Sequence, residues 1–230
     1  MTDTFVFSDY WPKPKNGELH MFSAFNPADQ KNIDSIVWNS GDNKIFFQED
    51  YHAEKWTATW VMDYNYRDSM GNYLGVMETA DIYPKYSYQF WTKFRTTSFE
   101  KGYAIPWGGI QKVGDVIDRP LKISLFGSTF FTFPAPGRQV VKFVDRHSTY
   151  TNGRGVSYKD VLEVTYDQTF GEKTAGARSW FAKGFGIIET QWRHKGQDVG
   201  EKLPMTITIG GGYIDENKYP VWTRLHPVWT

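Results

Sequence analysis

The sequence predicts a single all-β domain built on a strongly curved antiparallel sheet, either a half barrel or a sandwich. Segments in which apolar and polar residues alternate recur along the chain, and this period of two is typical of half-buried strands. Aromatic residues, which cover a pleated surface well, make up 18% of the 230 residues. No long segment keeps the 3.6-residue period of an amphipathic helix. A length of this order is common for one sandwich or barrel domain.

The first half of the chain is expected to contain one short helix followed by a three-stranded meander. The helix is expected over residues 26–33, where an Asn cap precedes Pro at the first helical position. In KWTATWVMDYNYR, residues 55–67, the large apolar side chains share one parity. Turn residues then lead into YLGVMETADIY (73–83) and YSYQFWTKFRTT (86–97). Consecutive hairpins of this kind predict antiparallel pairing.

The second half repeats the pattern in three further strands. They are expected in residues 121–133, 138–150 and 158–170, with the prolines of FPAPGR separating the first two. GEKTAGA at 171–177 is expected to turn the chain. RSWFAKGFGIIETQWR at 178–193 then forms a return strand that its glycines relax.

The two ends of the chain differ from the middle in composition. Each combines tryptophan with proline, so we expect an N-terminal arm over residues 1–20, a β domain over 21–202 and a C-terminal arm over 203–230. Aromatic anchors dominate many protein interfaces. The residues expected to anchor these arms in an assembly are Trp11, Trp222 and Trp229.

Composition excludes several classes of function. Lys and Arg total 26, as do Asp and Glu, so the chain has no basic surplus with which to bind nucleic acid. No apolar run is long enough to span a bilayer, and the start lacks the order of a secretory signal, so we expect a soluble protein of the cytoplasm or of a virion. The absence of cysteine removes thiol chemistry, and the scattered histidines predict neither a metal site nor a cofactor.

Candidate catalytic residues are few, and the sequence favours a protein that is not an enzyme. Two carboxylates across a cleft could hydrolyse a glycoside, and Asp160, Glu163, Asp167 and Glu189 are the acids in question, although neighbouring Lys and Arg residues could pair with them. If the protein is an enzyme, the candidates are two His residues, each beside an Arg on a predicted strand. Adjacent strand residues point to opposite faces, which argues against a shared cleft. These four residues are His147, His194, Arg146 and Arg193.

Residues 158–192 carry a resemblance to a known group of proteins. A D-V-L-x-V strand at 160–164 precedes an aromatic-x-A-K-G-x-G segment at 180–188, and this order is similar to the closing hairpin of bacterial lipoprotein-like proteins with curved antiparallel sheets. The resemblance implies a curved sheet and glycines that let the return strand bend, and it implies no catalytic residue. The chain differs from that group because it lacks an export signal and a lipidated cysteine.

Three hypotheses of function follow. The first is a non-enzymatic component of a larger assembly, such as a phage virion or tail protein, whose partners are protein subunits in a homo-oligomer or a mixed complex. The second is a carbohydrate-binding or receptor-binding module, and the third is a glycan-active enzyme such as a polysaccharide lyase. The residues expected to contact a glycan or receptor are Trp91, Trp107, Trp180 and Trp192.

Overall fold

The computed structural model describes residues 4–12, 15, 18–26, 31–39, 44–51, 56–67, 69, 73–81, 92–95, 103–106, 109–126, 132–170 and 173–211. In this part of the chain every element is a strand except one turn of 3-10 helix, η1 (Phe7–Asp9). The strands are β1 (Thr4–Val6), β2 (Glu18–Asn26), β3 (Lys31–Asn39), β4 (Lys44–Tyr51), β5 (Trp56–Arg67), β6 (Tyr73–Asp81), β7 (Thr92–Arg95), β8 (Tyr103–Ile105), β9 (Ile110–Lys112), β10 (Val116–Phe126), β11 (Thr132–Thr151), β12 (Ser157–Phe170), β13 (Lys173–Ala182), β14 (Gly186–His194) and β15 (Gln197–Gly211).

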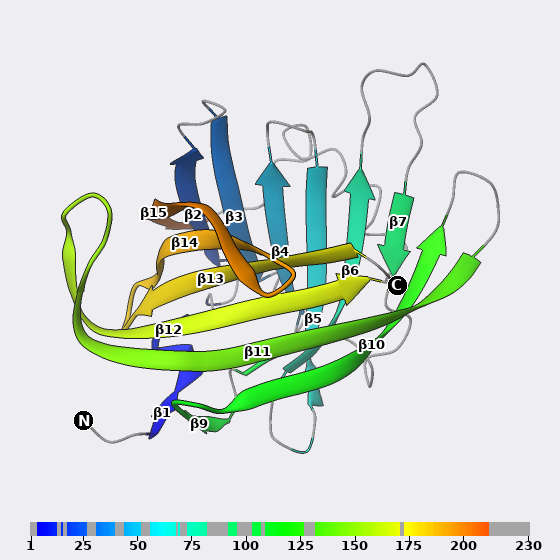
Figure 1. Ribbon diagram of the computed structural model, residues 1–230, viewed down its shortest axis with the longest axis horizontal. Coiled ribbons are helices and arrows are strands. Elements are labelled where there is room, and N and C mark those ends of the chain that lie inside the picture. The colour runs from blue at the N-terminus through cyan, green and yellow to red at the C-terminus, as the bar shows by residue number, and fades with distance from the viewer. Residues whose placement is uncertain are drawn as a thin grey trace.

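All strand pairings are antiparallel, and one sheet contains nearly every strand. Its order is β5-β4-β3-β2-β15-β14-β13-β12-β11-β10-β7-β6-β8, and an additional pairing of β5 with β6 makes the sheet close on itself. Strands β1 and β9 form a separate two-stranded sheet. Figure 1 shows the long strands β11–β13 passing across β3–β6, so the closed sheet has two layers. The prediction of a single all-β domain with a strongly curved antiparallel sheet is confirmed.

The first half of the chain confirms the meander and corrects the helix. Strand β5 pairs with β6, and β6 pairs with β7, as the alternation predicts. The helix expected over residues 26–33 is wrong, because Asn26 ends β2 and pairs with Lys31, the first residue of β3. Strands β2 and β3 run antiparallel on either side of this segment, so its described residues belong to strands and not to a helix. Residues 27–30 lie outside the described residues.

The prolines of FPAPGR do not interrupt the sheet as expected. Pro134 and Pro136 lie within β11 and pair with Ser124 and Lys122 of β10. On its other side, β11 pairs with β12 only from Gly137 onward. Proline has no N–H for a ladder, so it is tolerated where one edge of a strand has no partner.

Residues 171–193 also fold differently from the expectation. Strands β13 and β14 occupy the segment, and residues 183–185 form the turn between them. Gly184 and Gly186 have φ of +80° and +94°, values that L side chains rarely adopt, so these two glycines permit the turn. Gly176 lies inside β13, where a Cβ would come within 2.4 Å of the Tyr166 carbonyl oxygen. Gly176 therefore allows β12 and β13 to approach closely, and it does not form the turn that the sequence predicts.

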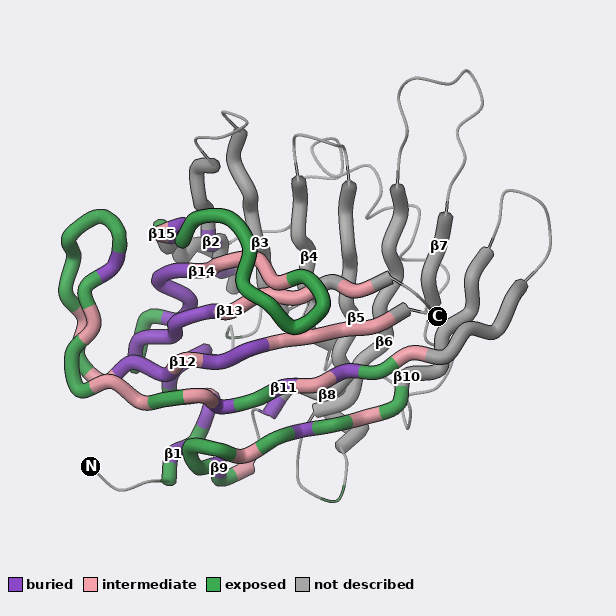
Figure 2. Tube along the Cα trace, viewed as in Figure 1, coloured by how far each residue is buried: buried purple, intermediate pink, exposed green. Residues whose placement is uncertain are grey.

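The main core lies between the N-terminal segment and one face of β10–β15. Phe7 of η1 is fully buried, and its ring centroid lies 5.5 Å from that of Phe143 and 5.1 Å from that of Phe181. Burial of each such ring stabilises the fold by about 1.5–3 kcal/mol. Figure 2 shows the buried residues gathered where β11–β14 pass the N-terminal strand. The cluster consists of Phe5, Phe7, Tyr10, Trp11, Phe22, Ile117, Val141, Phe143, Leu162, Val164, Phe181, Ile187, Leu203 and Met205.

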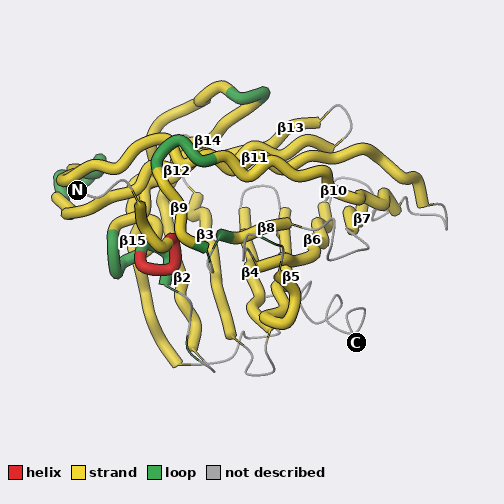
Figure 3. The backbone as a smooth tube through the Cα atoms, turned by 90° about the horizontal axis from the view of Figure 1, so that it is seen from below, coloured by secondary structure: helices red, strands yellow, loops and turns green. Residues whose placement is uncertain are grey.

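The described parts of both expected arms belong to this domain. Residues 4–11 supply four members of the core, and η1 lies against the layer of long strands in the second view (Figure 3). Residues 18–20 begin β2, and residues 203–211 complete β15. The remaining part of the expected C-terminal arm, residues 212–230, lies outside the described residues.

Candidate functional site

Opposite the main core, strands β11–β15 present a polar face on which charged side chains pair with one another. His147 Nε2 lies 3.1 Å from Glu163 Oε2, and Arg178 donates a hydrogen bond to the other oxygen of Glu163. Arg178 Nε also donates to Asp198 at 2.7 Å. The polar face is defined by His147, Glu163, Asp167, Arg178, Arg193 and Asp198.

The second arginine of the polar face continues this chain of ion pairs. Arg193 Nε donates to Asp167 at 3.1 Å, and its Nη1 donates to Asp198. Only a tenth of the Arg193 side chain is exposed, and a charge that is largely removed from water needs partners of this kind. The hydrogen-bonding groups of the polar face are therefore engaged with one another, and the arrangement stabilises the sheet.

A buried glutamate anchors the end of the sheet beside the polar face. Glu189 is 1% exposed, and it accepts hydrogen bonds from the Tyr150 hydroxyl and, at 2.7 Å, from the Gly153 amide. Lys202 Nζ donates to the Tyr150 hydroxyl at 3.1 Å and lies 4.2 Å from the Trp180 ring centroid. Burial, followed by the bond to Glu189, raises the pKa of Tyr150. A tyrosine whose pKa is raised in this way is poorly matched to proton transfer near neutral pH, either as an acid or as a base.

On the core side, a second polar cluster ties the N-terminal segment to β11 and β12. The Arg146 guanidinium donates to both Asp160 oxygens, at 2.7 and 2.9 Å, and the Tyr10 hydroxyl donates to Asp160 at 2.8 Å. The bond from Arg146 holds the pKa of Asp160 below its usual value. Nearby, Lys183 Nζ lies 3.5 Å from Asp9 Oδ2. These contacts fix η1 against the turn between β13 and β14.

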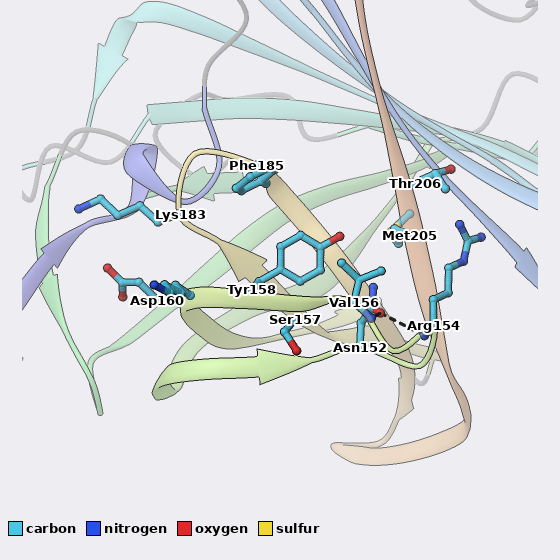
Figure 4. A pocket seen from close by; sticks show the side chains of 11 residues that line it. Asn152, Arg154, Val156, Ser157, Tyr158, Asp160, Lys183, Phe185, Met205 and Thr206 are labelled. Carbon is cyan, nitrogen blue, oxygen red and sulfur yellow. Dashed lines mark hydrogen bonds between the residues drawn. The ribbon is translucent and has the colours of Figure 1, made fainter.

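An open depression of about 900 Å³ lies between that turn and the loop from β11 to β12. Figure 4 shows Tyr158 and Phe185 facing one another near its centre, with Lys183 toward one end and Arg154 toward the other. The ring centroids of the two aromatics are 5.6 Å apart in an edge-to-face arrangement. The lining residues are Asn152, Arg154, Val156, Ser157, Tyr158, Lys159, Asp160, Lys183, Phe185, Met205 and Thr206.

The depression exposes apolar groups that the rest of the lining does not cover. Phe185 is 56% exposed and Val156 is 46% exposed, although both side chains are large and apolar. Two exposed cations, Arg154 and Lys159, stand beside them without a carboxylate partner among the residues described. Such a combination of aromatic and cationic groups is typical of binding surfaces.

The loop that bears part of this surface is held in one conformation. The side-chain oxygen of Asn152, a buried residue, accepts hydrogen bonds from the amides of Arg154 and Val156, each at 3.1 Å. Glu189 holds the intervening Gly153 amide. The loop therefore loses little conformational freedom when a ligand binds, which favours affinity.

The four candidate catalytic residues do not converge. Arg146 bonds to Asp160 beside the core, whereas His147 bonds to Glu163 on the polar face, so this adjacent pair is split as strand geometry predicts. Arg193 belongs to the polar face. His194 is exposed, and its ring Nδ1 lies 3.4 Å from the Thr174 hydroxyl.

The carboxylates considered for glycoside hydrolysis are each hydrogen-bonded to other side chains. Asp160 is engaged by Arg146, and Glu189 by Tyr150. Glu163 of β12 lies opposite Trp180 of β13, and Trp180 lies opposite Glu189 of β14. The tryptophan therefore stands between these two acids on the polar side of the sheet.

The tryptophans expected to bind a ligand or a neighbour are buried or partly buried where the structure describes them. Trp180 is 2% exposed beneath Tyr150 and Lys202, and Trp192 packs against the core. Trp11 is 8% exposed within the core of its own domain. The others, Trp91, Trp107, Trp222 and Trp229, lie outside the described residues.

The depression was not predicted from the sequence, although one signal for it exists. Phe185 lies between two glycines where the alternation of β13 ends, so the residue is placed at the tip of a tight turn. A large aromatic at such a tip is exposed unless another element covers it. Arg154 and Val156 gave no comparable signal, because the position of their loop also depends on the hydrogen bond from the Gly153 amide to Glu189, a residue far along the chain.

Comparisons with known protein families, with curated proteins and with solved structures found no match. Within the described ranges, no group of His, Asp and Glu residues is arranged to hold a metal ion. None of the described residues forms a helix long and apolar enough to cross a membrane.

Proposed function

We propose that this chain is a non-enzymatic interaction protein of a larger assembly, such as a virion or tail, and that the depression at the β13–β14 turn binds a protein partner. The observation that supports this most is the exposure of Phe185 at the tip of the turn, beside a loop held rigid by Asn152 and Glu189. Aromatic and arginine side chains dominate the energetics of protein interfaces, and both are present at this surface.

The engagement of the acidic and basic side chains elsewhere supports binding over catalysis. On the polar face, Glu163 contacts both His147 and Arg178. Asp198 contacts both Arg178 and Arg193. A catalytic acid or base has to exchange its proton with a substrate, and ion pairs of this kind oppose that exchange. Around Phe185, Lys183 lies 3.5 Å from Asp9, whereas Arg154 and Lys159 have no carboxylate partner among the residues described.

A photo-crosslinking experiment tests the proposal. The crosslinking amino acid p-benzoylphenylalanine replaces Phe185 in one variant and Ile110 in a second, because Ile110 is 76% exposed and does not line the depression. We expect one protein, identified by mass spectrometry, to be joined at position 185 and not at 110. The purified pair is then mixed, and Phe185→Ser should weaken binding at least about tenfold, as expected for an interface hot spot. Equal binding by Phe185→Ser and the unchanged chain would refute the proposal.

A further inference from the structure

The charges around the depression indicate what its partner carries. Arg154, Lys159 and Lys183 line it, and Asp160 is the one acidic residue of the lining. The Asp160 carboxylate is occupied on both oxygens by the Arg146 guanidinium, so it offers little negative potential to a ligand. Lys183 lies 3.5 Å from Asp9, so Arg154 and Lys159 are the cations that make this surface locally positive on a chain whose net charge is zero.

The positions of the apolar and charged groups indicate the order in which a matching ligand carries its own apolar and charged groups. In Figure 4, Tyr158 and Phe185 occupy the middle, and Lys183 and Arg154 lie to either side of them. Val156 and Met205 add apolar surface to the lining. A ligand that matches this order has an apolar centre with a negative charge at each end.

We propose that the partner binds through an extended peptide segment in which apolar residues are flanked on both sides by Asp or Glu. This inference rests on the proposed function and names the chemistry of the partner at the same surface. An acidic glycan fits less well, because Phe185 has no hydrogen-bonding group and its ring already packs against Tyr158 in an edge-to-face pair, with the centroids 5.6 Å apart. Apolar side chains of a peptide bury the exposed Phe185 and Val156, and the flanking carboxylates meet Arg154 and Lys183.

Fluorescence polarisation with three labelled peptides tests the inference. Each peptide contains a central Leu-Phe pair, flanked on both sides by glutamates, by serines or by lysines. Each exposed ion pair strengthens binding about two- to fivefold, so the glutamate peptide should bind about tenfold more tightly than the serine peptide at low salt. The lysine peptide should bind weakest. The preference for glutamate should shrink as NaCl is added, because the contacts are exposed to solvent.

Matched charge reversals locate the effect. Arg154→Glu and Lys183→Glu should remove most of the preference for the glutamate peptide, and Phe185→Ser should weaken binding of both the glutamate and the serine peptide. Lys142→Glu makes the same change of charge on β11 at an exposed residue that does not line the depression, and it should leave all affinities unchanged. Thermal melts of each variant check that the fold is retained.

The possible results separate this inference from the proposed function. Equal binding of the glutamate and serine peptides, with loss of both in Phe185→Ser, would overturn the acidic partner while supporting a binding surface at Phe185. Binding of no peptide would overturn the inference, and the crosslinking experiment would then decide the proposed function alone. A glutamate preference that survives Arg154→Glu but is lost in Lys142→Glu would place the contact elsewhere and also overturn the inference.

Discussion

The glycines of the β13–β14 turn allow a sharp test of how the two layers of the sheet meet. Gly184 and Gly186 both have positive φ, +80° and +94°, so alanine is strained at either position by about 1–2 kcal/mol. A Cβ on Gly184 would meet nothing within 4 Å, whereas a Cβ on Gly186 would lie 2.6 Å from Phe22 Cε1 and 2.9 Å from its Cζ. Phe22 is fully buried on β2 and has little room to move.

The overlap with Phe22 gives the expected size of the difference. Forcing an extra methyl group into a packed core costs about 1–3 kcal/mol beyond the backbone strain. Gly184→Ala should therefore lower the free energy of unfolding by about 1–2 kcal/mol and Gly186→Ala by about 2–5 kcal/mol. For a chain of this length each kcal/mol corresponds to about 2–4 °C in Tm. Thermal and urea unfolding of both variants measure the difference.

A double-mutant cycle shows whether Phe22 is the cause. Phe22→Leu removes the ring atoms that the new methyl group would meet, so the double variant Phe22→Leu with Gly186→Ala should be more stable than the sum of the single effects predicts. Strictly additive effects, or a Gly186→Ala variant as stable as Gly184→Ala, would refute the packing of this turn against β2.

Three further predictions concern titration and buried polar groups. Asp160→Asn tolerates the φ of +54° but loses the charge-assisted bond to Arg146, and it should lower the free energy of unfolding by about 1.5–3 kcal/mol at pH 7. Because the folded-state pKa of Asp160 is lowered, the advantage of the native chain over this variant should be present above about pH 4 and disappear as pH falls further, in urea titrations across pH. Glu189→Gln replaces one of the two accepting oxygens by an NH2 group, which would point its N–H at a buried donor, either the Tyr150 hydroxyl or the Gly153 amide. The free energy of unfolding should fall by about 1–3 kcal/mol, and hydrogen exchange of the Gly153 amide should become faster. The contribution of three buried or partly buried tyrosines to stability should be constant up to about pH 10 and fall above it, because their raised folded-state pKa values keep them protonated after the tyrosines of the unfolded chain ionise. These are Tyr10, Tyr150 and Tyr166.

The sequence predicts the fold class well because the alternation in β5 and β12 is a local property of each strand. It predicts the β5–β6 hairpin, but it does not predict the closure of the sheet, because closure also needs the pairings of β2 with β15 and of β7 with β10. These strands are far apart along the chain, so no local pattern encodes their pairing. The helix expected at 26–33 fails for a related reason. An Asn-Pro sequence is compatible with the start of a helix and also with a connection between two strands. The pairing of Asn26 with Lys31, which the sequence does not show, makes the flanking residues strands.

The candidate site is harder to predict because its parts are joined by contacts between distant residues. Glu189 holds Gly153, and Asp160 holds Tyr10, at separations that no local pattern encodes. Burial also reverses the expectation for tryptophan. Trp180 looks suitable for a ligand in the sequence, but Tyr150 and Lys202 cover it, and the smaller ring of Phe185 is the exposed one.

The most direct test of the account is an amide NMR titration of the labelled chain with the glutamate-flanked peptide. The largest chemical-shift changes should fall in the loop at residues 152–156 and in the turn at 183–185, and they should saturate with a single affinity. Amides of the polar face, such as those of Glu163 and Arg193, should change little because their side chains remain paired. Changes concentrated on the polar face, with none at the turn, would contradict the account.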